Sequence, residues 1–356
     1  RVSPACQRLL ARWRREPPVD LRLETPALRT AADVHAALAA AGPQVRTVML
    51  GPWGDSEDAH GGHVDPGEAI ACDSADLAVQ SLWAGRDTWS AWSLRSFGVC
   101  ELTCQNSASL AGLVGAVPDS ANTIRLARLG LAANGAFEGC LQALRQRPRG
   151  GPILLDLSGN GLRDEHAFGL VPLVASAPAE VDAPEFAAAA PIAAGLNLCG
   201  NAQITSAGLR ALLAARSVAA ALQELDVSEC GIGPEGAQLL VAHLQAPSCA
   251  LRDLAAYRCG LGAEGVRALA AAGARAPALR ALNLVANGQH VGCWPAAIGE
   301  PIVRALTASV ALRVLTLSCP EEQLKAARLA FDTVPVRVIL VPNEQNNYNR
   351  SLFLGD

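Results

Sequence analysis

Leucines occur in short groups at a nearly constant distance along the chain. Three consecutive groups read LQELDVSEC, LRDLAAYRC and LRALNLVAN, and they begin at Leu222, Leu251 and Leu279, which lie 29 and 28 residues apart. The alternation of apolar and polar residues within each group predicts a strand of about five residues. The same frame fits residues 126–134, 152–160 and 193–201, and its leucines alone recur at 312–317.

The second half of each repeat predicts a helix. Apolar residues recur at i, i+3 and i+4 over residues 232–244 and 261–269, which is the pattern of a helix with one buried stripe. Gly208, Gly236 and Gly265 occupy the same phase near the start of these helices. We expect these glycines to let a helix approach a strand where a side chain would not fit.

A strand and a helix of this length cannot bury their apolar faces alone, so successive repeats must stack on one another. Because a helix is wider than the strand spacing of about 4.8 Å, the stack should curve. The sequence therefore predicts an α/β solenoid with the shape of a horseshoe, in which parallel strands line the concave face and helices cover the convex face.

The expected organisation has three parts. Residues 1–18 are arginine-rich and amphipathic, and we expect a capping helix there, with the remnant of a mitochondrial presequence as the alternative. The repeat array spans residues 19–341 and is less regular in its first third, and a polar tail follows at residues 342–356. The repeat distance is broken in three places, which predicts insertions at about 52–96, 174–191 and 288–297.

Composition narrows the class of protein. Hydrophobic residues make up 51% of the chain, which excludes wholesale disorder, and aromatic residues only 4%, so the core must be aliphatic. The net charge of −4 does not favour nucleic-acid binding, and no apolar run reaches the roughly 18 residues of a membrane-spanning helix.

Eleven cysteines without a CxxC pair indicate buried thiols in a reducing compartment. We therefore expect an intracellular protein, with the cytoplasm, including its cytoskeletal or ciliary structures, favoured over the mitochondrial matrix.

The repeats resemble those of the leucine-rich-repeat superfamily, specifically the ribonuclease-inhibitor-like class, whose repeats are about 28–29 residues long and read LxxLxLxx(N/C)xL. The resemblance covers residues 126–317 best. It implies that the Asn or Cys side chain after each strand turns inward and hydrogen-bonds the loop backbone, as a structural ladder rather than as a nucleophile. The ladder residues of this chain are Asn134, Asn160, Asn201, Cys230, Cys259 and Asn287.

Few residues suggest catalysis or metal binding. The sequence has no P-loop, no GxGxxG after a strand, no GxSxG and no HExxH motif, so we expect neither an enzyme nor a cofactor or small-molecule substrate. His60 and His63 lie among acidic residues, but in a glycine-rich stretch, where we expect a solvated loop rather than a metal site. Residues 156–161 look like the opening of a calcium loop, but Ala167 occupies the position of the required glutamate.

The outward-facing positions of the strands should line the inner wall of the solenoid in parallel columns, one row per repeat. These columns carry both signs of charge, which suits a folded protein partner better than a polyanion. The residues expected to contact the partner are Arg128, Asp156, Glu224, Asp226, Arg252, Asp253, Tyr257, Arg280, Asn283 and Arg313. Tyrosine and arginine are the usual anchors of interfaces, so Tyr257 and the arginines at 252, 280 and 313 are the strongest candidates.

A second candidate surface is the tryptophan-rich end of the first insertion. Trp83, Trp89 and Trp92 lie within ten residues of one another in a chain that is otherwise poor in aromatics. Side chains of this size either close the local core or contact a partner, and the sequence leaves both alternatives open.

The sequence therefore favours a non-catalytic scaffold protein that binds one or more protein partners as a structural subunit of a multiprotein complex, without nucleic-acid readout. The first alternative is a regulator, either a GTPase activator or an inhibitor of the leucine-rich-repeat type, although the chain lacks the acidic tail of Ran-type activators. The second is an enzyme with titratable groups in residues 52–98. The resemblance cannot choose between these functions, because one fold serves many.

Overall fold

The computed structural model describes residues 7, 20–24, 31–51, 79–102, 106–147, 151–174, 192–214, 216–287 and 300–342. The chain divides into two compact units, Arg1–Gly161 and Leu162–Asp356. In both units strands alternate with helices along the chain, as the repeat pattern predicts.

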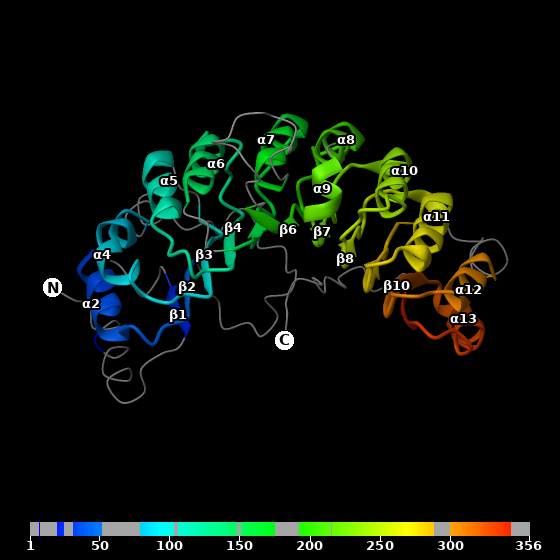
Figure 1. The fold of residues 1–356 in the computed structure, drawn as a ribbon. Coiled ribbons are helices and arrows are strands. Elements are labelled where there is room, and N and C mark those ends of the chain that lie inside the picture. Colours follow the sequence, from blue (N-terminus) through cyan, green and yellow to red (C-terminus); the bar gives the residue numbers. More distant parts are fainter. Residues whose placement is uncertain are drawn as a thin grey trace. The chain divides into compact units, whose positions relative to one another are not determined.

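The first unit contains a parallel sheet whose strands lie side by side in chain order. The strands are β1 (Asp20–Glu24), β2 (Thr47–Gly51), β3 (Ser96–Cys100), β4 (Thr123–Ala127) and β5 (Ile153–Asp156). The helices are α2 (Ala31–Ala41), α4 (Arg86–Trp89), α5 (Ser107–Gly115) and α6 (Ala136–Gln146). These helices lie along one side of the sheet (Figure 1).

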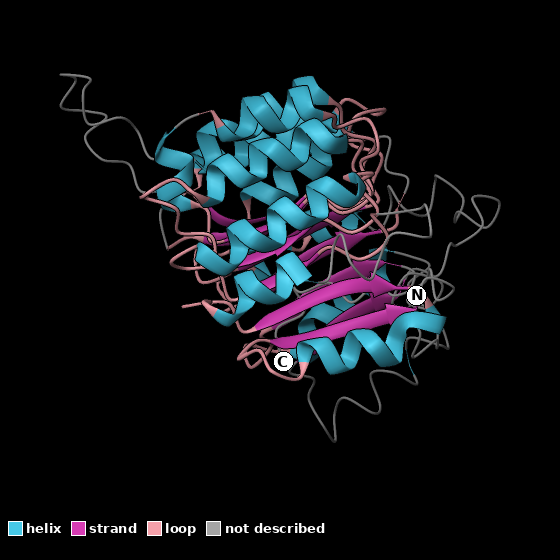
Figure 2. Ribbon diagram, turned by 90° about the vertical axis from the view of Figure 1, so that its right-hand side faces the viewer, coloured by secondary structure: helices cyan, strands magenta, loops and turns pink. Residues whose placement is uncertain are grey.

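The second unit repeats this arrangement with shorter strands, again parallel and in chain order. The strands are β6 (Ala193–Asn197), β7 (Glu224–Asp226), β8 (Asp253–Ala255), β9 (Ala281–Asn283), β10 (Val314–Cys319) and β11 (Arg337–Pro342). The helical segments are α7 (Asp164–Val174), α8 (Ser206–Leu213), α9 (Arg216–Ala221), α10 (Gly233–Leu244), α11 (Gly262–Arg275), α12 (Glu300–Thr307), η4 (Glu321–Gln323) and α13 (Leu324–Phe331). The helices form a layer over one face of the strands (Figure 2).

The core of the second unit is a row of leucines contributed by successive strands. Leu196, Leu225, Leu254, Leu282 and Leu315 are paired in register from β6 to β10, and none is more than 1% exposed. Each strand alone would leave its leucine in water, whereas the stacked strands form one continuous apolar layer. The predicted strand-and-helix repeat with an aliphatic core is therefore confirmed.

The glycines near the helix starts serve a different contact from the one expected. A Cβ atom on Gly265 would lie 2.8 Å from the Cβ atom of Ala237, which belongs to the neighbouring helix α10. A Cβ atom on Gly208 would lie 3.0 Å from the Cα atom of Asp164, the first residue of α7. The expectation of a helix-to-strand approach was wrong at these two positions, because the close neighbour is the adjacent helix.

The structure describes only some of the segments that the sequence predicts as a cap, insertions or a tail. Of the first predicted insertion, residues 79–96 are described: residues 79–84 and α4 are helical, and Val79, Leu82 and Leu94 are buried. Several predicted segments lie outside the described residues. They are the capping helix apart from Gln7, residues 52–78, 175–191 and 288–297 of the insertions, and the tail from residue 343 onward. Among the helices that the structure describes, none combines the length and apolarity needed to cross a membrane.

Candidate functional site

The loop after each strand is fixed by the side chain at the ladder position. The Asn160 Oδ1 atom accepts a hydrogen bond from the Leu129 backbone N–H at 2.8 Å, and its Nδ2 donates to the Leu126 carbonyl at 2.6 Å, both in the preceding repeat. Asn287 likewise accepts from the Cys259 N–H at 2.8 Å. Asn160 and Asn287 are almost fully buried, so these amides satisfy loop groups that water cannot reach.

The ladder cysteines use their thiols in the same way. The Cys230 thiol donates to the Leu198 carbonyl at 3.3 Å, and the Cys259 thiol donates to the Val227 carbonyl at 3.0 Å. Burial raises the pKa of the Cys230 thiol and that of the Cys259 thiol well above the ordinary range. A buried thiol with a raised pKa is a poor nucleophile, so both side chains are arranged for structure rather than for thiolate chemistry.

The remaining ladder asparagines also bond to backbone groups. Asn201 accepts from the Leu162 N–H at 3.0 Å, and Asn134 donates to the Leu129 carbonyl at 3.0 Å. None of the seven cysteines in the described part of the chain forms a disulfide, and six of them are buried.

Each strand of the second unit presents a second set of side chains on the side opposite the leucine core. We call this side the polar face; one of its rows is Glu224, Asp253, Ala281, Val314 and Arg337, which the strand pairing aligns in register. Side chains alternate along a strand, so the next outward row consists of Asn197, Asp226, Ala255, Asn283, Thr316 and Ile339.

Short polar side chains hold the turns that follow the strands, both in the second row of the polar face and at Asp156 on β5 of the first unit. The side-chain oxygens of Asp156, Asn197, Asp226 and Asn283 each accept the backbone N–H two residues further on, at 2.8 to 3.2 Å. Where Ala255 interrupts the series, the Ser228 hydroxyl of the neighbouring strand accepts the Tyr257 N–H at 3.1 Å instead. These are Asx turns, in which a short polar side chain replaces a backbone acceptor.

The Asx turns change the picture of three residues expected to contact a partner. Asp156 is half-buried, whereas Asp226 and Asn283 are only 3% and 5% exposed. Each commits one side-chain oxygen to its own turn. Their first role in this structure is to shape the turn. Sequence analysis missed this role, although the recurrence of Asp or Asn at one position of the frame was a signal for it.

Tyr257 lies inside the fold rather than at its surface. Its side chain packs with Val285 and Val341, and only 3% of the residue is exposed. The Arg258 guanidinium lies 5.8 Å from the centre of the tyrosine ring, and burial raises the pKa of the Tyr257 hydroxyl. The ring expected to anchor a partner is therefore not available on the surface, and Tyr257 is left out of the interaction surface proposed below.

Two carboxylates of the polar face lie directly opposite each other. Glu224 and Asp253 are partners in register on β7 and β8, and both are half-buried. Burial raises the pKa of Glu224, and the nearby charge of Asp253 raises it further, while Arg252 opposes the shift. Burial also raises the pKa of Asp253 against the opposing effect of Arg280 and Arg252. Like charges in this position repel each other across the strands.

Arg252, Arg280 and Arg313 come directly before β8, β9 and β10 and border the polar face, and Arg337, in register with Val314, continues them on β11; we call these four residues the arginine stripe. The Arg252 carbonyl accepts the Arg280 N–H at 2.6 Å, the Arg280 carbonyl accepts the Arg313 N–H at 2.7 Å, and the Arg313 carbonyl accepts the Arg337 N–H at 2.9 Å. All four residues are exposed. Sequence analysis missed Arg337, because its strand lacks the leucine spacing that marks the other repeats.

Arg128 in the first unit has a partner within the chain. Its Nη1 atom lies 2.7 Å from the Glu101 Oε1 atom, and both side chains are partly exposed. The guanidinium is therefore engaged in an ion pair, which reduces its value as a contact for another molecule.

Two of the three tryptophans belong to the core of the first unit. Trp89 is fully buried, donates from Nε1 to the Leu82 carbonyl at 3.0 Å and stacks on Phe97 with ring centres 5.4 Å apart. Trp92 is 6% exposed. Trp83 is partly exposed, with the Arg86 guanidinium 4.2 Å above its ring. Burial of Trp89 and Trp92 fits the alternative in which the tryptophans close the core, and leaves Trp83 as the one of the three within reach of a partner.

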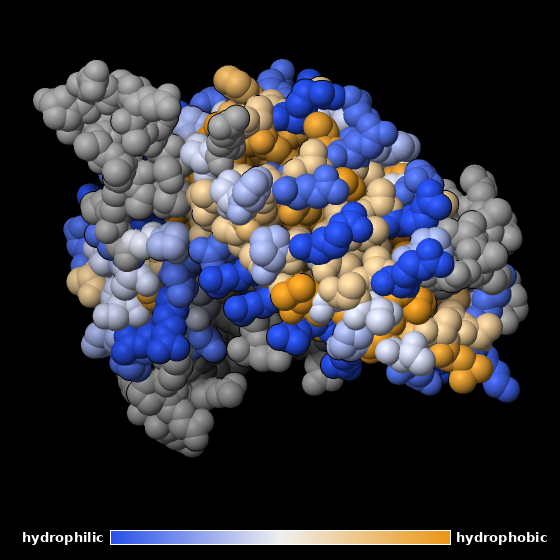
Figure 3. Space-filling view, turned by 45° about the vertical axis from the view of Figure 1, so that its right-hand side comes forward, coloured by the Kyte–Doolittle hydropathy of each residue, from blue (hydrophilic) through white to orange (hydrophobic). Residues whose placement is uncertain are grey.

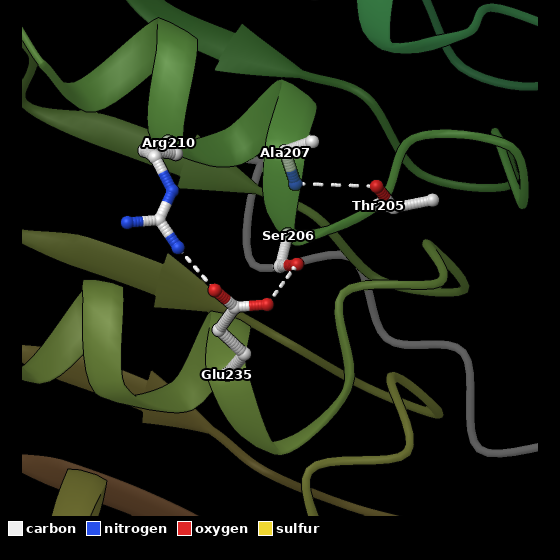
Figure 4. A network of polar contacts seen from close by, with 5 residues as sticks. All are labelled: Thr205, Ser206, Ala207, Arg210 and Glu235. Atoms are coloured by element: carbon white, nitrogen blue, oxygen red, sulfur yellow. Dashed lines mark hydrogen bonds and ion pairs between the residues drawn. The ribbon is translucent and has the colours of Figure 1, made fainter.

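The helix side of the second unit carries polar contacts that tie neighbouring helices together (Figure 4). The Ser206 hydroxyl donates to the Glu235 Oε2 atom at 2.7 Å, and Arg210 forms an ion pair with the Glu235 Oε1 atom. These contacts join the start of α8 to the start of α10. The Asp164 carboxylate accepts the Thr205 N–H at 2.7 Å and the Thr205 hydroxyl at 2.8 Å, so it fixes the start of α8 from α7.

In the part of the chain that the structure describes, the exposed large apolar side chains lie apart from one another. Phe168, Val310 and Leu329 are exposed, but they lie on α7, after α12 and on α13 respectively. The face shown in Figure 3 likewise mixes hydrophilic with hydrophobic residues. Charged groups are therefore the more distinctive recognition feature of this chain.

No group of three or more His, Cys, Asp or Glu side chains in the described ranges is placed to hold a metal ion. His60 and His63, which sequence analysis considered as metal ligands, lie outside those ranges.

Comparison with known proteins agrees with this architecture. The family model for the Leucine Rich repeat matches residues 221–241, which include β7, the loop after it and most of α10. The crystal structure of the leucine-rich repeat-containing protein LegL7 from Legionella pneumophila is similar over 91% of each chain, with a TM-score of 0.53 and 17% identity. This chain thus has the α/β repeat fold seen in leucine-rich-repeat proteins, and its residues 221–241 match a Leucine Rich repeat.

A further similarity is weaker. The crystal structure of the Rad7 and Elc1 complex in yeast matches with a TM-score of 0.47 and 14% identity, over 87% of this chain and 66% of that chain, which is too low to define a shared fold. A comparison with curated protein sequences gives no match.

Proposed function

We propose that this protein is a non-catalytic scaffold that binds a folded protein partner on the polar face of its second unit, as a subunit of a larger assembly. The observation that carries the proposal is the pair Glu224 and Asp253. Among the described residues, neither carboxylate has a hydrogen-bond or ion-pair partner, although the two are adjacent and half-buried. Such a pair costs stability in the free protein, and a cationic group of a partner would relieve that cost.

The support around this pair is rigid. Asx turns hold the strand ends, ladder side chains tie each loop to the preceding repeat, and the leucine row fixes the sheet from below. A preorganised surface loses little entropy when it binds. The repeat distance of 28 and 29 residues further supports placing the chain in the ribonuclease-inhibitor-like class, and the buried thiols support a reducing compartment.

The test is affinity capture of the full chain from native extract at moderate salt, followed by identification of the bound proteins. We expect the wild type to bring down one set of proteins in stoichiometric amounts, and Glu224→Gln with Asp253→Asn to lose it. The matched control is Glu138→Gln with Asp332→Asn, which removes two exposed acids from α6 and from the end of α13. The proposal is wrong if the chain comes down alone, or if the polar-face variant retains the same proteins as the control.

A further inference from the structure

Among the described residues, several arginines of the second unit are paired with acids, but those of the arginine stripe are not. Arg210, Arg258 and Arg267 each form an ion pair with a glutamate, whereas no member of the stripe lies within ion-pair distance of an acid in the part of the chain that the structure describes. Asp253 acts electrostatically on Arg252 and Arg280 from a longer distance. Arg313 and Arg337 therefore carry the least compensated positive charge of the polar face.

The floor beside these arginines is neutral and partly apolar. Val314 is aligned with Ala281 on one side and with Arg337 on the other, and Ile339 is aligned with Thr316. Ala281, Val314 and Ile339 are all partly exposed. Guanidinium groups and aliphatic side chains thus lie side by side on β9, β10 and β11.

We propose that the arginine stripe and this floor bind an acidic segment of the partner protein, in which Asp or Glu residues alternate with aliphatic ones. The inference rests on the proposed function and specifies the partner's chemistry at the same face. In an extended segment, successive side chains point in opposite directions, so carboxylates can face the stripe while aliphatic side chains face Ala281, Val314 and Ile339. Arginine is well suited to this task, since its guanidinium can bind a carboxylate through two parallel hydrogen bonds.

The spacing of the stripe fits such a segment. Three of its arginines directly precede β8, β9 and β10, and the fourth is the first residue of β11. Neighbouring strands lie about 4.8 Å apart, and side chains on one edge of an extended segment repeat at about 6.6 Å. The difference of about 1.8 Å per strand is within the reach of long, flexible arginine side chains for neighbouring members of the stripe. Their backbone positions are fixed by the hydrogen bonds that run from Arg252 through Arg280 and Arg313 to Arg337.

The charges at the other end of the polar face argue against a uniformly anionic polymer. Glu224, Asp226 and Asp253 lie on β7 and β8, next to the Arg252 end of the stripe. A nucleic acid carries its negative charge along its whole length and would meet these carboxylates when it crossed the face. A protein segment can be acidic over β9 to β11 and neutral or basic beyond them.

The probe for this inference is a short fluorescent peptide of alternating glutamate and alanine, with its glutamine counterpart and an oligothymidylate of equal charge as comparisons. Binding to the full chain is measured by fluorescence anisotropy at about 50 mM salt, where surface charges are weakly screened. We expect the glutamate peptide to bind and the other two to bind at least tenfold more weakly. Arg313→Glu with Arg337→Glu should weaken peptide binding by at least tenfold. The control, Arg275→Glu with Arg328→Glu, changes the net charge equally at exposed positions of α11 and α13 and should leave binding unchanged.

The inference is overturned if the glutamate peptide does not bind, if the glutamine peptide binds equally well, if oligothymidylate binds more tightly, or if both arginine variants behave alike. Should the charge reversal disturb folding, judged by circular dichroism, Arg313→Gln with Arg337→Gln provides the same test without adding negative charge. The two proposals can fail separately. If a partner is captured through Glu224 and Asp253 but the glutamate peptide does not bind, the acidic-segment proposal is refuted and the scaffold proposal is retained. Peptide binding without any captured partner would refute the scaffold function alone.

Discussion

Glu229 and Arg258 occupy the same position of adjacent repeats, both with a left-handed backbone, and their side chains form an ion pair. Their φ angles are 57° and 50°, and the Arg258 Nη1 atom lies 3.4 Å from the Glu229 Oε1 atom. Glu101 and Arg128 repeat this relationship in the first unit, with φ angles of 57° and 56° and a distance of 2.7 Å. A left-handed backbone costs a residue with a side chain about 1–2 kcal/mol, whereas an exposed ion pair contributes at most about 1 kcal/mol. The turn is therefore imposed by the stacking of repeats.

This imposed turn predicts a stabilising substitution at Ala286, which has a φ angle of 58° at the equivalent position. Ala286→Gly removes the steric cost of the left-handed backbone, and we expect the free energy of unfolding to rise by up to about 1 kcal/mol, since part of the gain is offset by the greater freedom of glycine in the unfolded chain. Thermal unfolding followed by circular dichroism measures the change. The control Ala268→Gly, inside α11, should lower stability by about 1 kcal/mol. Equal effects of the two substitutions would contradict the argument.

The ladder predicts a large loss of stability at Asn287. Asn287→Ala leaves the buried Cys259 N–H and the Leu284 carbonyl without their side-chain partner, and each such group costs about 1–3 kcal/mol. We expect a loss of about 2–4 kcal/mol in the free energy of unfolding, measured by thermal or urea denaturation. Asn287→Cys keeps a donor of the kind that Cys230 and Cys259 use at this position. It should therefore lose less, and an equal loss in both variants would show that the side-chain hydrogen bonds are not the cause.

The strands and their core could be predicted from the sequence because burial itself dictates their pattern. A leucine at a fixed position in each repeat is the direct consequence of stacking, so Leu225, Leu254 and Leu282 could be placed before any coordinates. The role of the ladder position was implied by the resemblance to leucine-rich repeats, and its physical reason is that a small polar side chain satisfies loop groups enclosed by two repeats.

The parts of the candidate site that could not be predicted depend on residues that are distant in sequence or belong to another element. Tyr257 is buried by Val341, which lies 84 positions further along, and no local pattern announces that contact. The burial of Trp89 depends on its stacking with Phe97 on β3, which is close in sequence but belongs to a different element. Arg337 joins the stripe because its strand pairs with β10, although the spacing of its repeat is irregular. Exposure is a property of the assembled fold, so sequence could identify candidate contacts but could not decide which of them reach the surface.

The approach of α11 to α10 predicts that Gly265 cannot be enlarged without cost. Gly265→Ala improves helix propensity by about 1 kcal/mol, but its Cβ atom would lie 2.8 Å from that of Ala237, which is closer than such atoms can stand. We expect a net loss of about 1–2 kcal/mol in stability by thermal unfolding, as overpacking usually produces. Ala237→Gly combined with Gly265→Ala should recover part of it. Gly115→Ala is the matched control, since its Cβ atom would meet its nearest neighbour at an ordinary 3.7 Å, and it should not destabilise.

The opposed carboxylates predict a pH-dependent gain from neutralising one of them. Because burial raises the pKa of Asp253, the folded state disfavours the carboxylate, and stability is lost as the pH rises through that raised value. Asp253→Asn should therefore raise the melting temperature at neutral pH by about 1 °C or more, from the relief of repulsion with Glu224. The gain should shrink as the pH falls and should vanish only below the unfolded-state pKa of about 3.9, where Asp253 is protonated in both the folded and the unfolded state. Comparing the variant with the wild type at each pH cancels other titrations, and Asp332→Asn at an exposed position serves as control. A gain that is the same at neutral pH and below that pKa would mean that the charge of Asp253 is not its source, and a loss at neutral pH would mean that its attraction to Arg252 and Arg280 outweighs the burial of its carboxylate.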